Sequence, residues 1–269
     1  MPDGRTRAAT VGAMSTVLSV NVGRVRTVGP VRSGIDKRPV DGPVAVAAPG
    51  PRGHGGSGLA GDDVWDLRHH GGDDQAVYVY AREDLDDWSA DLGRPLASGS
   101  FGENLTTAGV DVSATVVGEQ WQVGDDLLLE VSDPRIPCRT FADFLAERRW
   151  VRRFTERAAP GTYLRVLRPG PVRAGDPIRV VLRPDHGVTV RTAFRALTTA
   201  PQLLPLLGPA TQLSAEVRDL VRRRVPVAMD ADAADPEDPG PEDAGAGDTD
   251  AGADRATGRD AGVAVGDER

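Results

Sequence analysis

The chain has 269 residues, enough for one large domain or two small ones, and its single cysteine excludes an intramolecular disulfide and any all-cysteine zinc or iron–sulfur site. It carries 40 acidic and 32 basic residues, but residues 230–269 hold 13 of the acidic residues against 3 arginines, so the remainder is slightly basic. No apolar run approaches the length of a membrane span and no secretory signal is visible, so we expect a cytoplasmic protein with no membrane contact.

Both ends of the chain are predicted to be disordered. Residues 1–13 are polar and lack periodicity, and Met14, just before the first predicted strand, is the expected natural start. Residues 229–269 contain no aromatic residue and are rich in Ala, Gly and Asp. Such a segment cannot bury enough apolar surface to offset its ordering entropy, so we expect an acidic tail that solubilises the protein or folds back on the basic segment 222–224.

Short apolar, β-branched runs recur along residues 14–183, separated by turns rich in Gly and Pro. They predict strands at 17–22, 44–47, 76–80, 114–123, 127–131, 162–167 and 178–182. Helices are predicted over 82–92 and 140–157, with their aromatic residues in the core. This spacing favours a mainly β fold, a largely antiparallel β-barrel with interspersed helices.

Residues 184–228 follow a helical pattern instead. A first short helix is predicted around Ala193 and Leu197, a second from Leu203 to Leu207, and a third that begins after Ser214 as its N-cap. A three-helix segment of this size cannot be relied on to fold alone, so we expect it to pack on the barrel domain.

Cys138 is the most informative single residue, because it lies in the turn PRIPCR just ahead of a helix expected to begin near Thr140. A thiolate is favoured by nearby cations and by a helix N-terminus, and Arg135 and Arg139 flank this cysteine. The alternative is a buried cysteine that only fills apolar space.

Two polar loops precede Cys138. Residues 68–75 (RHHGGDDQ) place paired glycines beside histidine and aspartate, which lets the backbone approach an anion or a polar ring. Their chemistry alone is compatible with an ordinary loop, a metal-binding turn or a polar-ligand site. Residues 101–107 (FGENLTT) could hydrogen-bond a heterocycle or cap a turn.

Taken in order, several segments of the chain resemble the MOSC domain, which is related to the C-terminal part of molybdenum-cofactor sulfurase. The segments are GIDKRPV, GLAGD, HHGGDDQAVYVYAR, FGENLTT, VGD, PRIPC and GTYLRV. The likeness is greatest to the YiiM-type branch, which also carries a three-helix C-terminal extension, and it covers about residues 15–225.

The resemblance implies a β-barrel that binds the molybdenum cofactor, a molybdopterin, with Cys138 as the metal ligand. By motif position it implies a pocket lined by His70, Gly71, Gly72, Asp74, Asn104 and Arg135, with Lys37 and Asp62 as further candidates. It also implies an oxidoreductase that reduces N-hydroxylated compounds, such as base analogues, to amines. In that activity His70 or Asp74 would place or protonate the substrate, and Arg135 or Lys37 would meet the pterin phosphate.

A chain with one cysteine and no dinucleotide-binding Gly-x-Gly-x-x-Gly element after a strand cannot readily carry its own iron–sulfur or flavin relay. A separate electron-donating reductase is therefore expected, docked on the arginine-rich face of the last helix or on the acidic tail.

Two non-enzymatic roles stay open. The chain could carry the molybdenum cofactor without turnover, or carry sulfur as a persulfide on Cys138. Sulfur transfer requires a desulfurase domain with pyridoxal phosphate, for which the chain has no room, and Lys37 is the only lysine able to form the imine. Pyridoxal phosphate is therefore not expected. Nucleic-acid binding is not expected either, because no basic stretch is interleaved with aromatic residues.

Overall fold

The computed structural model describes residues 15–28 and 30–229, which belong to one compact unit. The predictions made for residues 1–13, for Met14 and for the acidic tail lie outside the described residues. The division of the chain into a domain over 14–183 and a segment over 184–228 remains a prediction. No helix in the described part of the chain has both the length and the apolar character needed to cross a membrane.

The described residues form twelve strands, five α-helices and three short 3₁₀ helices. The strands are β1 (Thr16–Gly23), β2 (Arg26–Val28), β3 (Val31–Ser33), β4 (Lys37–Pro39), β5 (Val44–Val46), β6 (Val77–Ala81), β7 (Leu105–Ala108), β8 (Gln120–Val123), β9 (Leu127–Pro134), β10 (Thr162–Arg168), β11 (Gly170–Val172) and β12 (Ile178–Leu182). The helices are η1 (Asp73–Gln75), α1 (Arg82–Leu92), η2 (Val112–Ala114), α2 (Arg139–Leu145), α3 (Trp150–Arg157), α4 (Val190–Leu197), η3 (Pro201–Leu207) and α5 (Ala215–Arg223).

Eight strands make one mixed sheet in the order β12-β8-β9-β10-β6-β7-β1-β4. Neighbouring strands are antiparallel except for β6 and β7, which are parallel and are connected through α1. A parallel pair requires such a crossover, because a tight turn cannot return the chain to the same end of the sheet. Two smaller sheets pair β11 with β5 and β2 with β3.

The large sheet curls but does not close. Its edges are β4 and β12, yet the start of β12 meets the start of β1, where Ile178 N–H donates to Ser15 O at 2.8 Å. The contact is an isolated bridge between Thr16 and Pro177, and a proline has no N–H with which to extend a ladder. The mainly β fold class is confirmed, while the expected closed barrel is corrected to an open, curled sheet.

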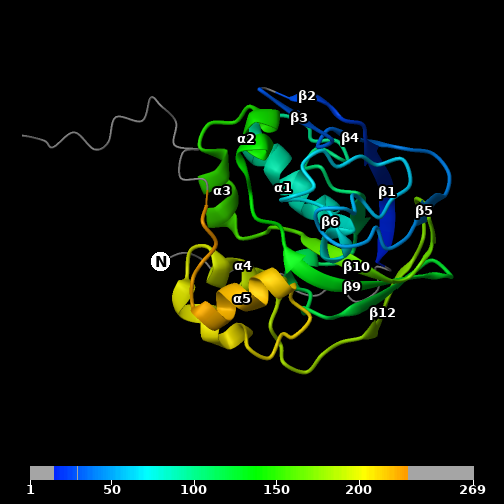
Figure 1. Cartoon of the computed structure of the whole chain (residues 1–269). Coiled ribbons are helices and arrows are strands. Elements are labelled where there is room, and N and C mark those ends of the chain that lie inside the picture. Colours follow the sequence, from blue (N-terminus) through cyan, green and yellow to red (C-terminus); the bar gives the residue numbers. More distant parts are fainter. Residues whose placement is uncertain (1–14, 29, 230–269) are drawn as a thin grey trace, which may run out of the picture. The chain divides into compact units, whose positions relative to one another are not determined.

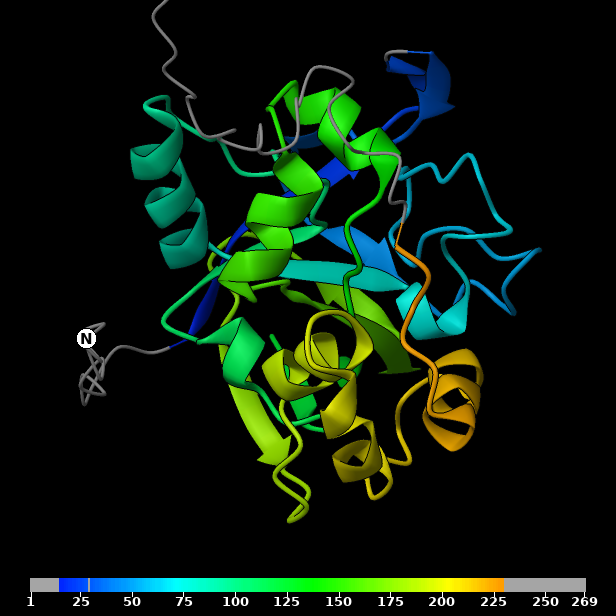
Figure 2. The ribbon, with the colours of Figure 1, turned by 90° about the vertical axis from the view of Figure 1, so that its left-hand side faces the viewer.

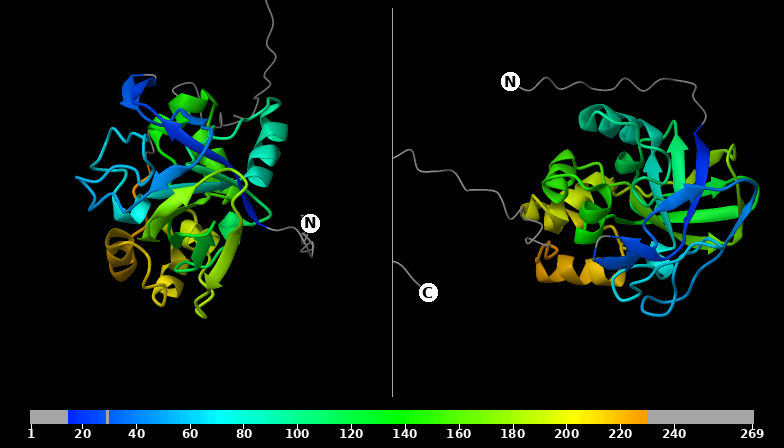
Figure 3. Two further views of the ribbon diagram at one scale, coloured as in Figure 1. Left: turned by 90° about the vertical axis from the view of Figure 1, so that its right-hand side faces the viewer. Right: turned by 90° about the horizontal axis from the view of Figure 1, so that it is seen from above.

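Helices α2 to α5 gather on one side of the strands, as Figures 1 and 3 show, and Figure 2 looks onto that side. The C-terminal helices are present as predicted, although the second of them, η3, is a 3₁₀ helix. Ser214 caps α5 as expected, because its side chain accepts a hydrogen bond from Val217 N–H. The segment contacts the sheet through α4, which lies against β9.

The single helix predicted over 140–157 is wrong, since the structure has two helices there. Ala146 and Arg149 adopt positive φ angles of 54° and 53°, which end α2 and precede α3. The first of these helices begins at Arg139, with Cys138 as its N-cap residue.

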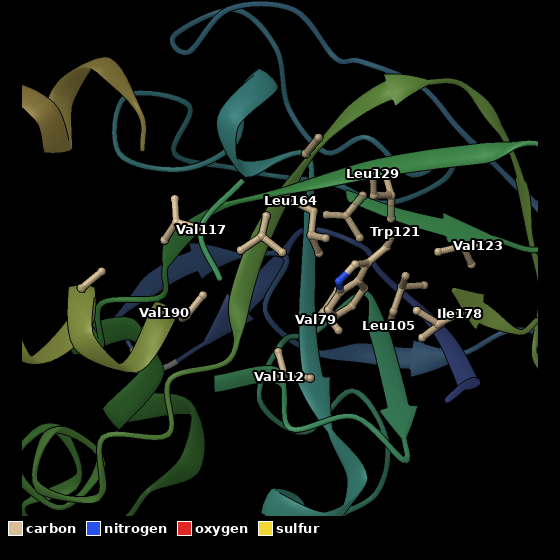
Figure 4. Close-up of a cluster of buried hydrophobic side chains, with 14 of the residues drawn as sticks. Val79, Leu105, Val112, Val117, Trp121, Val123, Leu129, Leu164, Ile178 and Val190 are labelled. Carbon is tan, nitrogen blue, oxygen red and sulfur yellow. The ribbon is translucent and has the colours of Figure 1, made fainter. Parts of the chain in front are cut away.

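Two groups of buried side chains make up the core. Figure 4 shows the first, in which Trp121 lies among aliphatic side chains from facing strands, including Leu105, Leu129 and Ile178. The second, which we call the aromatic cluster, lies between α1, α2 and α3 and comprises Tyr78, Tyr80, Trp88, Phe101, Phe141, Trp150, Phe154 and Phe194 with smaller apolar neighbours. Their rings meet at 4.6–6.3 Å, distances at which aromatic pairs attract one another. Because Phe141 belongs to α2, this cluster fixes the helix that follows Cys138.

Candidate functional site

A cavity of about 730 Å³, which we call the main cavity, lies where the loop after β3, the loop before η1 and the segment after β9 meet. It brings together seven of the nine site residues expected from the sequence. These are Lys37, Asp62, His70, Gly71, Asn104, Arg135 and Cys138.

The remaining two, Gly72 and Asp74, do not line the main cavity. The carboxylate of Asp74 accepts a hydrogen bond from Arg165 Nε at 2.9 Å, and its backbone oxygen accepts one from Ser132 Oγ at 2.6 Å. Gly72 has φ near 80°, and a Cβ there would lie 2.6 Å from the backbone nitrogen of Arg52. Both residues hold the loop onto its neighbours, so Asp74 is not part of the function proposed below.

One wall of the main cavity is a buried ionic network around Asp62. Lys37 Nζ contacts both oxygens of the Asp62 carboxylate, while Asn104 Nδ2 and Gly23 N–H donate to it at 2.8 and 2.7 Å. Burial lowers the pKa of Lys37, and the charge of Asp62 opposes that shift. Asn104 Oδ1 in turn accepts from Tyr78 N–H at 3.1 Å. Both polar atoms of the Asn104 amide therefore hydrogen-bond to protein groups, and these bonds hold the residues of this wall in place.

Arg135 supplies a buried positive charge. Its side chain lies 4.0 Å above the ring of Phe141 and 5.0 Å from that of Tyr78, and it donates to the backbone oxygen of Phe101 at 2.6 Å. Among residues 15–28 and 30–229, no carboxylate forms an ion pair with it. A guanidinium buried to 6% exposure without a carboxylate partner can bind an anionic group, because a charge-assisted hydrogen bond would add to its ring contacts and its bond to Phe101.

Cys138 is half-buried, lines the main cavity and packs against the edge of the aromatic cluster. The residue has an extended backbone as the N-cap of α2, and Phe141 anchors that helix one turn later. The thiol is therefore held at the cavity wall.

His70 lies on the wall near Arg135. Burial, with a further contribution from the Arg135 charge, lowers the pKa of His70 to about 4, so its imidazole is neutral at neutral pH. His69 instead contacts Asp66 through Nδ1 at 2.7 Å on the exposed side of the loop. Within the part of the chain that the structure describes, no group of three or more His, Cys, Asp or Glu is placed to hold a metal ion. A metal bound here would have to bring most of its ligands with it.

Three further polar residues of this wall were not predicted from the sequence. Tyr78 is a buried phenol and Tyr163 a half-buried one, and burial raises the pKa of both, so both are neutral hydrogen-bonding groups. The side-chain oxygen of Gln75 is buried and has no hydrogen-bond partner. Gln75 and Tyr78 occur in the segment HHGGDDQAVYVYAR, beside or within a predicted strand. The sequence alone does not distinguish them from other core residues, and only the structure shows that both line the main cavity.

Comparison with known proteins gives consistent results. The MOSC domain matches residues 66–179. The chain is 33% identical over 184 residues to the uncharacterized protein YflK of Bacillus subtilis (strain 168), covering 67% of this chain and 79% of that protein. It is 32% identical to a protein named Reductase from Gibberella moniliformis, of which it spans only 35%.

The crystal structure of YiiM from Geobacillus stearothermophilus superimposes on this chain with a TM-score of 0.64 and 26% identity. The match covers 78% of this chain and 99% of that one. The chain therefore belongs to the MOSC-domain family and is a YiiM-type member of it.

Proposed function

We propose that this protein binds the molybdenum cofactor in the main cavity and reduces N-hydroxylated compounds, such as N-hydroxylated base analogues, to amines. The observation that carries the proposal is the meeting of a thiol, an unpaired buried cation and a neutral imidazole at one cavity wall: Cys138, Arg135 and His70. Membership of the MOSC family supports the cofactor, and the relative named Reductase supports the reaction class.

The residues present fit such a cofactor. A volume of about 730 Å³ lies within the range of small-molecule sites. Arg135 suits a phosphate, because a guanidinium binds phosphate oxygens in a planar, charge-assisted geometry. A cysteine thiolate is a soft ligand that a metal with its own organic ligands can accept.

The reaction is a two-electron reduction in which R–NHOH, two electrons and two protons give R–NH₂ and water. The N–O bond breaks, the nitrogen is reduced, and the oxygen leaves as water. When bound, the molybdenum cofactor supplies the redox-active centre for the two electrons. The neutral His70 can accept a hydrogen bond from the substrate hydroxyl, and the neutral phenol of Tyr163 can donate one, so both can orient the N–O group.

The electrons come from a separate reductase of the iron–sulfur or flavin class. The letters GSGLAG at 56–61 match the spacing of a dinucleotide-binding loop, but Leu59 forms an isolated β-bridge with Val46 and the next helix is the single turn η1. A dinucleotide site of that kind requires the glycines to open an α-helix directly. The proposed function therefore needs a partner for turnover.

The test is viologen-driven reduction of an N-hydroxylated purine by the full chain loaded with isolated molybdenum cofactor. We expect turnover in the wild type and a loss of at least about a hundredfold in Cys138→Ser, since removal of even an outer-sphere partner of a metal ligand costs up to that much. The unfolding midpoint of the cofactor-free variant serves as the folding control. Full activity in Cys138→Ser contradicts the proposal, and tight cofactor binding without turnover in the wild type favours the cofactor-carrier role.

A further inference from the structure

A second cavity of about 400 Å³ adjoins the main cavity on the side of the C-terminal helices. The two cavities share part of their walls, including His70, Gln75, Cys138, Thr140 and Tyr163. Cys138 thus stands at the junction, where a molecule in the second cavity and a group in the main cavity can approach each other.

The lining of the second cavity is mixed: Arg52, Asp66, Arg139 and Glu216 supply charged groups, and one side is apolar. Val217 and Leu220 of α5 lie on it together with Leu197 of α4, and Ile136 and Pro137 face the space from the segment before Cys138. Apolar walls bind an uncharged ring well and a charged group poorly, because the charge would lose its hydration without a partner. The apolar side of the cavity therefore favours contact with the face of a flat, uncharged ring system.

Two contacts fix α5 as this wall. Asp133, buried at the end of β9, accepts a hydrogen bond from Ser214 N–H at 3.0 Å and so holds the N-terminus of the helix. Arg52, in the loop that carries the glycines, forms an ion pair with Glu216 in the first turn of α5. Since Val217 follows Glu216 directly, these contacts determine where the apolar wall stands.

The junction also contains a polar group that awaits a ligand. The side-chain oxygen of Gln75 is fully buried and has no protein partner, although buried polar atoms are almost always hydrogen-bonded. An N–H or O–H donor on a molecule in the second cavity would satisfy it. A hydroxylamino group attached to a ring carries both kinds of donor.

We propose that the second cavity is the substrate site, and that it takes a flat, uncharged heteroaromatic ring carrying an N-hydroxylamino group. The ring lies between Leu220 and Pro137, and the hydroxylamino group points to Gln75 and Cys138. This inference rests on the proposed function, because it assigns the main cavity to the cofactor. It makes the C-terminal helical segment the determinant of substrate specificity.

The test fills the cavity without touching the cofactor site. In Leu220→Trp, we expect the KM for an N-hydroxylated purine to rise at least about tenfold, the equivalent of one lost hydrogen bond or a methylene-scale clash. Molybdenum content should equal that of the wild type. Leu206→Trp is the matched control, because Leu206 is 57% exposed on η3 and lines neither cavity, so its KM should not change.

A binding measurement separates this inference from the proposed function. Calorimetric titration of the cofactor-free full chain with the N-hydroxylated purine should show binding to the wild type and to Leu206→Trp, and at least about tenfold weaker binding to Leu220→Trp. If the ring binds in this pattern but loaded enzyme never turns over, the proposed function fails and the site assignment stands. Equal affinity in folded Leu220→Trp and wild type overturns the site assignment.

Gln75→Leu provides a second variant in case Leu220→Trp does not fold. Replacing an unsatisfied buried amide with an apolar side chain of similar size should not destabilise the cofactor-free protein. The affinity for the N-hydroxylated purine should nevertheless fall about tenfold, because the substrate loses its acceptor. Unchanged affinity in Gln75→Leu contradicts the orientation proposed for the hydroxylamino group.

Discussion

Burial in the folded protein changes the pH at which His70 takes up a proton. Its ordinary pKa of 6.5 falls to about 4, mainly through burial, so the unfolded chain binds a proton at a higher pH than the folded chain. The free energy of unfolding should therefore decrease as the pH falls from about 6.5 to about 4, by up to about 3 kcal/mol from this residue alone, and should be independent of it at higher pH.

Urea unfolding of the wild type and His70→Gln at a series of pH values checks this expectation. The two stability curves should run parallel above pH 6.5 and diverge below it, with the variant less sensitive to acid. Asp133, whose pKa burial raises to about 6, contributes a slope of the opposite sign, but it is present in both proteins and cancels in the difference. His54→Gln, at an exposed position, is the control. Parallel curves down to pH 4 would show that His70 is not shielded from water.

At the scale of single residues, the sequence alone predicts that two residues of the main cavity lie close together. Cys138 and Arg135 are three positions apart in one proline-stiffened turn, so their association is a property of the sequence itself. Asp74 was expected at the site because the resemblance placed it there by motif position, yet it pairs with Arg165, a partner 91 positions away. Gln75 was missed because only tertiary packing decides which polar side chain is left without a partner.

Helices α2 and α3 are separated by residues 146–149, which contain no glycine or proline to indicate a helix end. Ala146 adopts φ of 54° as the C-cap of α2, a conformation that glycine adopts without steric cost and that costs other residues about 1–2 kcal/mol. The apolar periodicity continues across the break, which is why one long helix was predicted. The strain is offset by the burial of aromatic side chains on both helices.

Ala146→Gly should therefore stabilise the protein, by about 0.5–1 kcal/mol after the larger backbone entropy of glycine in the unfolded chain is subtracted. Chemical denaturation of the cofactor-free protein measures the change. Ala142→Gly, in the interior of α2, is the matched control and should destabilise by a similar amount. Destabilisation in both variants would mean that Ala146 is not held in the left-handed conformation.

The Lys37–Asp62 pair joins β4 to the loop that precedes η1. Both side chains are almost completely buried, at 8% and 0% exposure, so removal of one charge leaves the other uncompensated. We expect Lys37→Met to lower the free energy of unfolding by about 3–5 kcal/mol, and the double variant with Asp62→Asn to recover most of that loss. A double-mutant cycle measured by denaturant unfolding gives the coupling between the residues. Additive effects of the two substitutions would show that the pair is solvated.

Pairing between strands that are distant in the sequence also explains which strands could be predicted and which could not. Strands with several β-branched residues, such as β1, β6 and β12, were predicted within a few residues of their observed bounds. The short strands β3 and β7 were not predicted from the sequence, and the strands that they pair with define them. The mainly β class was thus predictable, whereas the open sheet was not, because it depends on β1 and the start of β12 meeting only in an isolated bridge at Pro177.

At the scale of the whole molecule, helices of the described chain gather on one side of the curled sheet (Figures 2 and 3), and the second cavity is lined by residues of β9 and of α4 and α5. The sheet supplies the rigid ends from which Arg135 and Cys138 project, and the C-terminal helices supply a wall of the second cavity. Under the proposed function, one part of the chain would hold the cofactor while another would select the substrate.

The central claim is that Cys138 is the protein ligand of a molybdenum centre in the main cavity. X-ray absorption at the molybdenum edge, on the full chain loaded with cofactor, tests it most directly. The account predicts one more sulfur neighbour of the metal in the wild type than in Cys138→Ser, with similar metal content once both are saturated. The same sulfur coordination in both proteins would contradict the account, because the cofactor would then be held without the thiol.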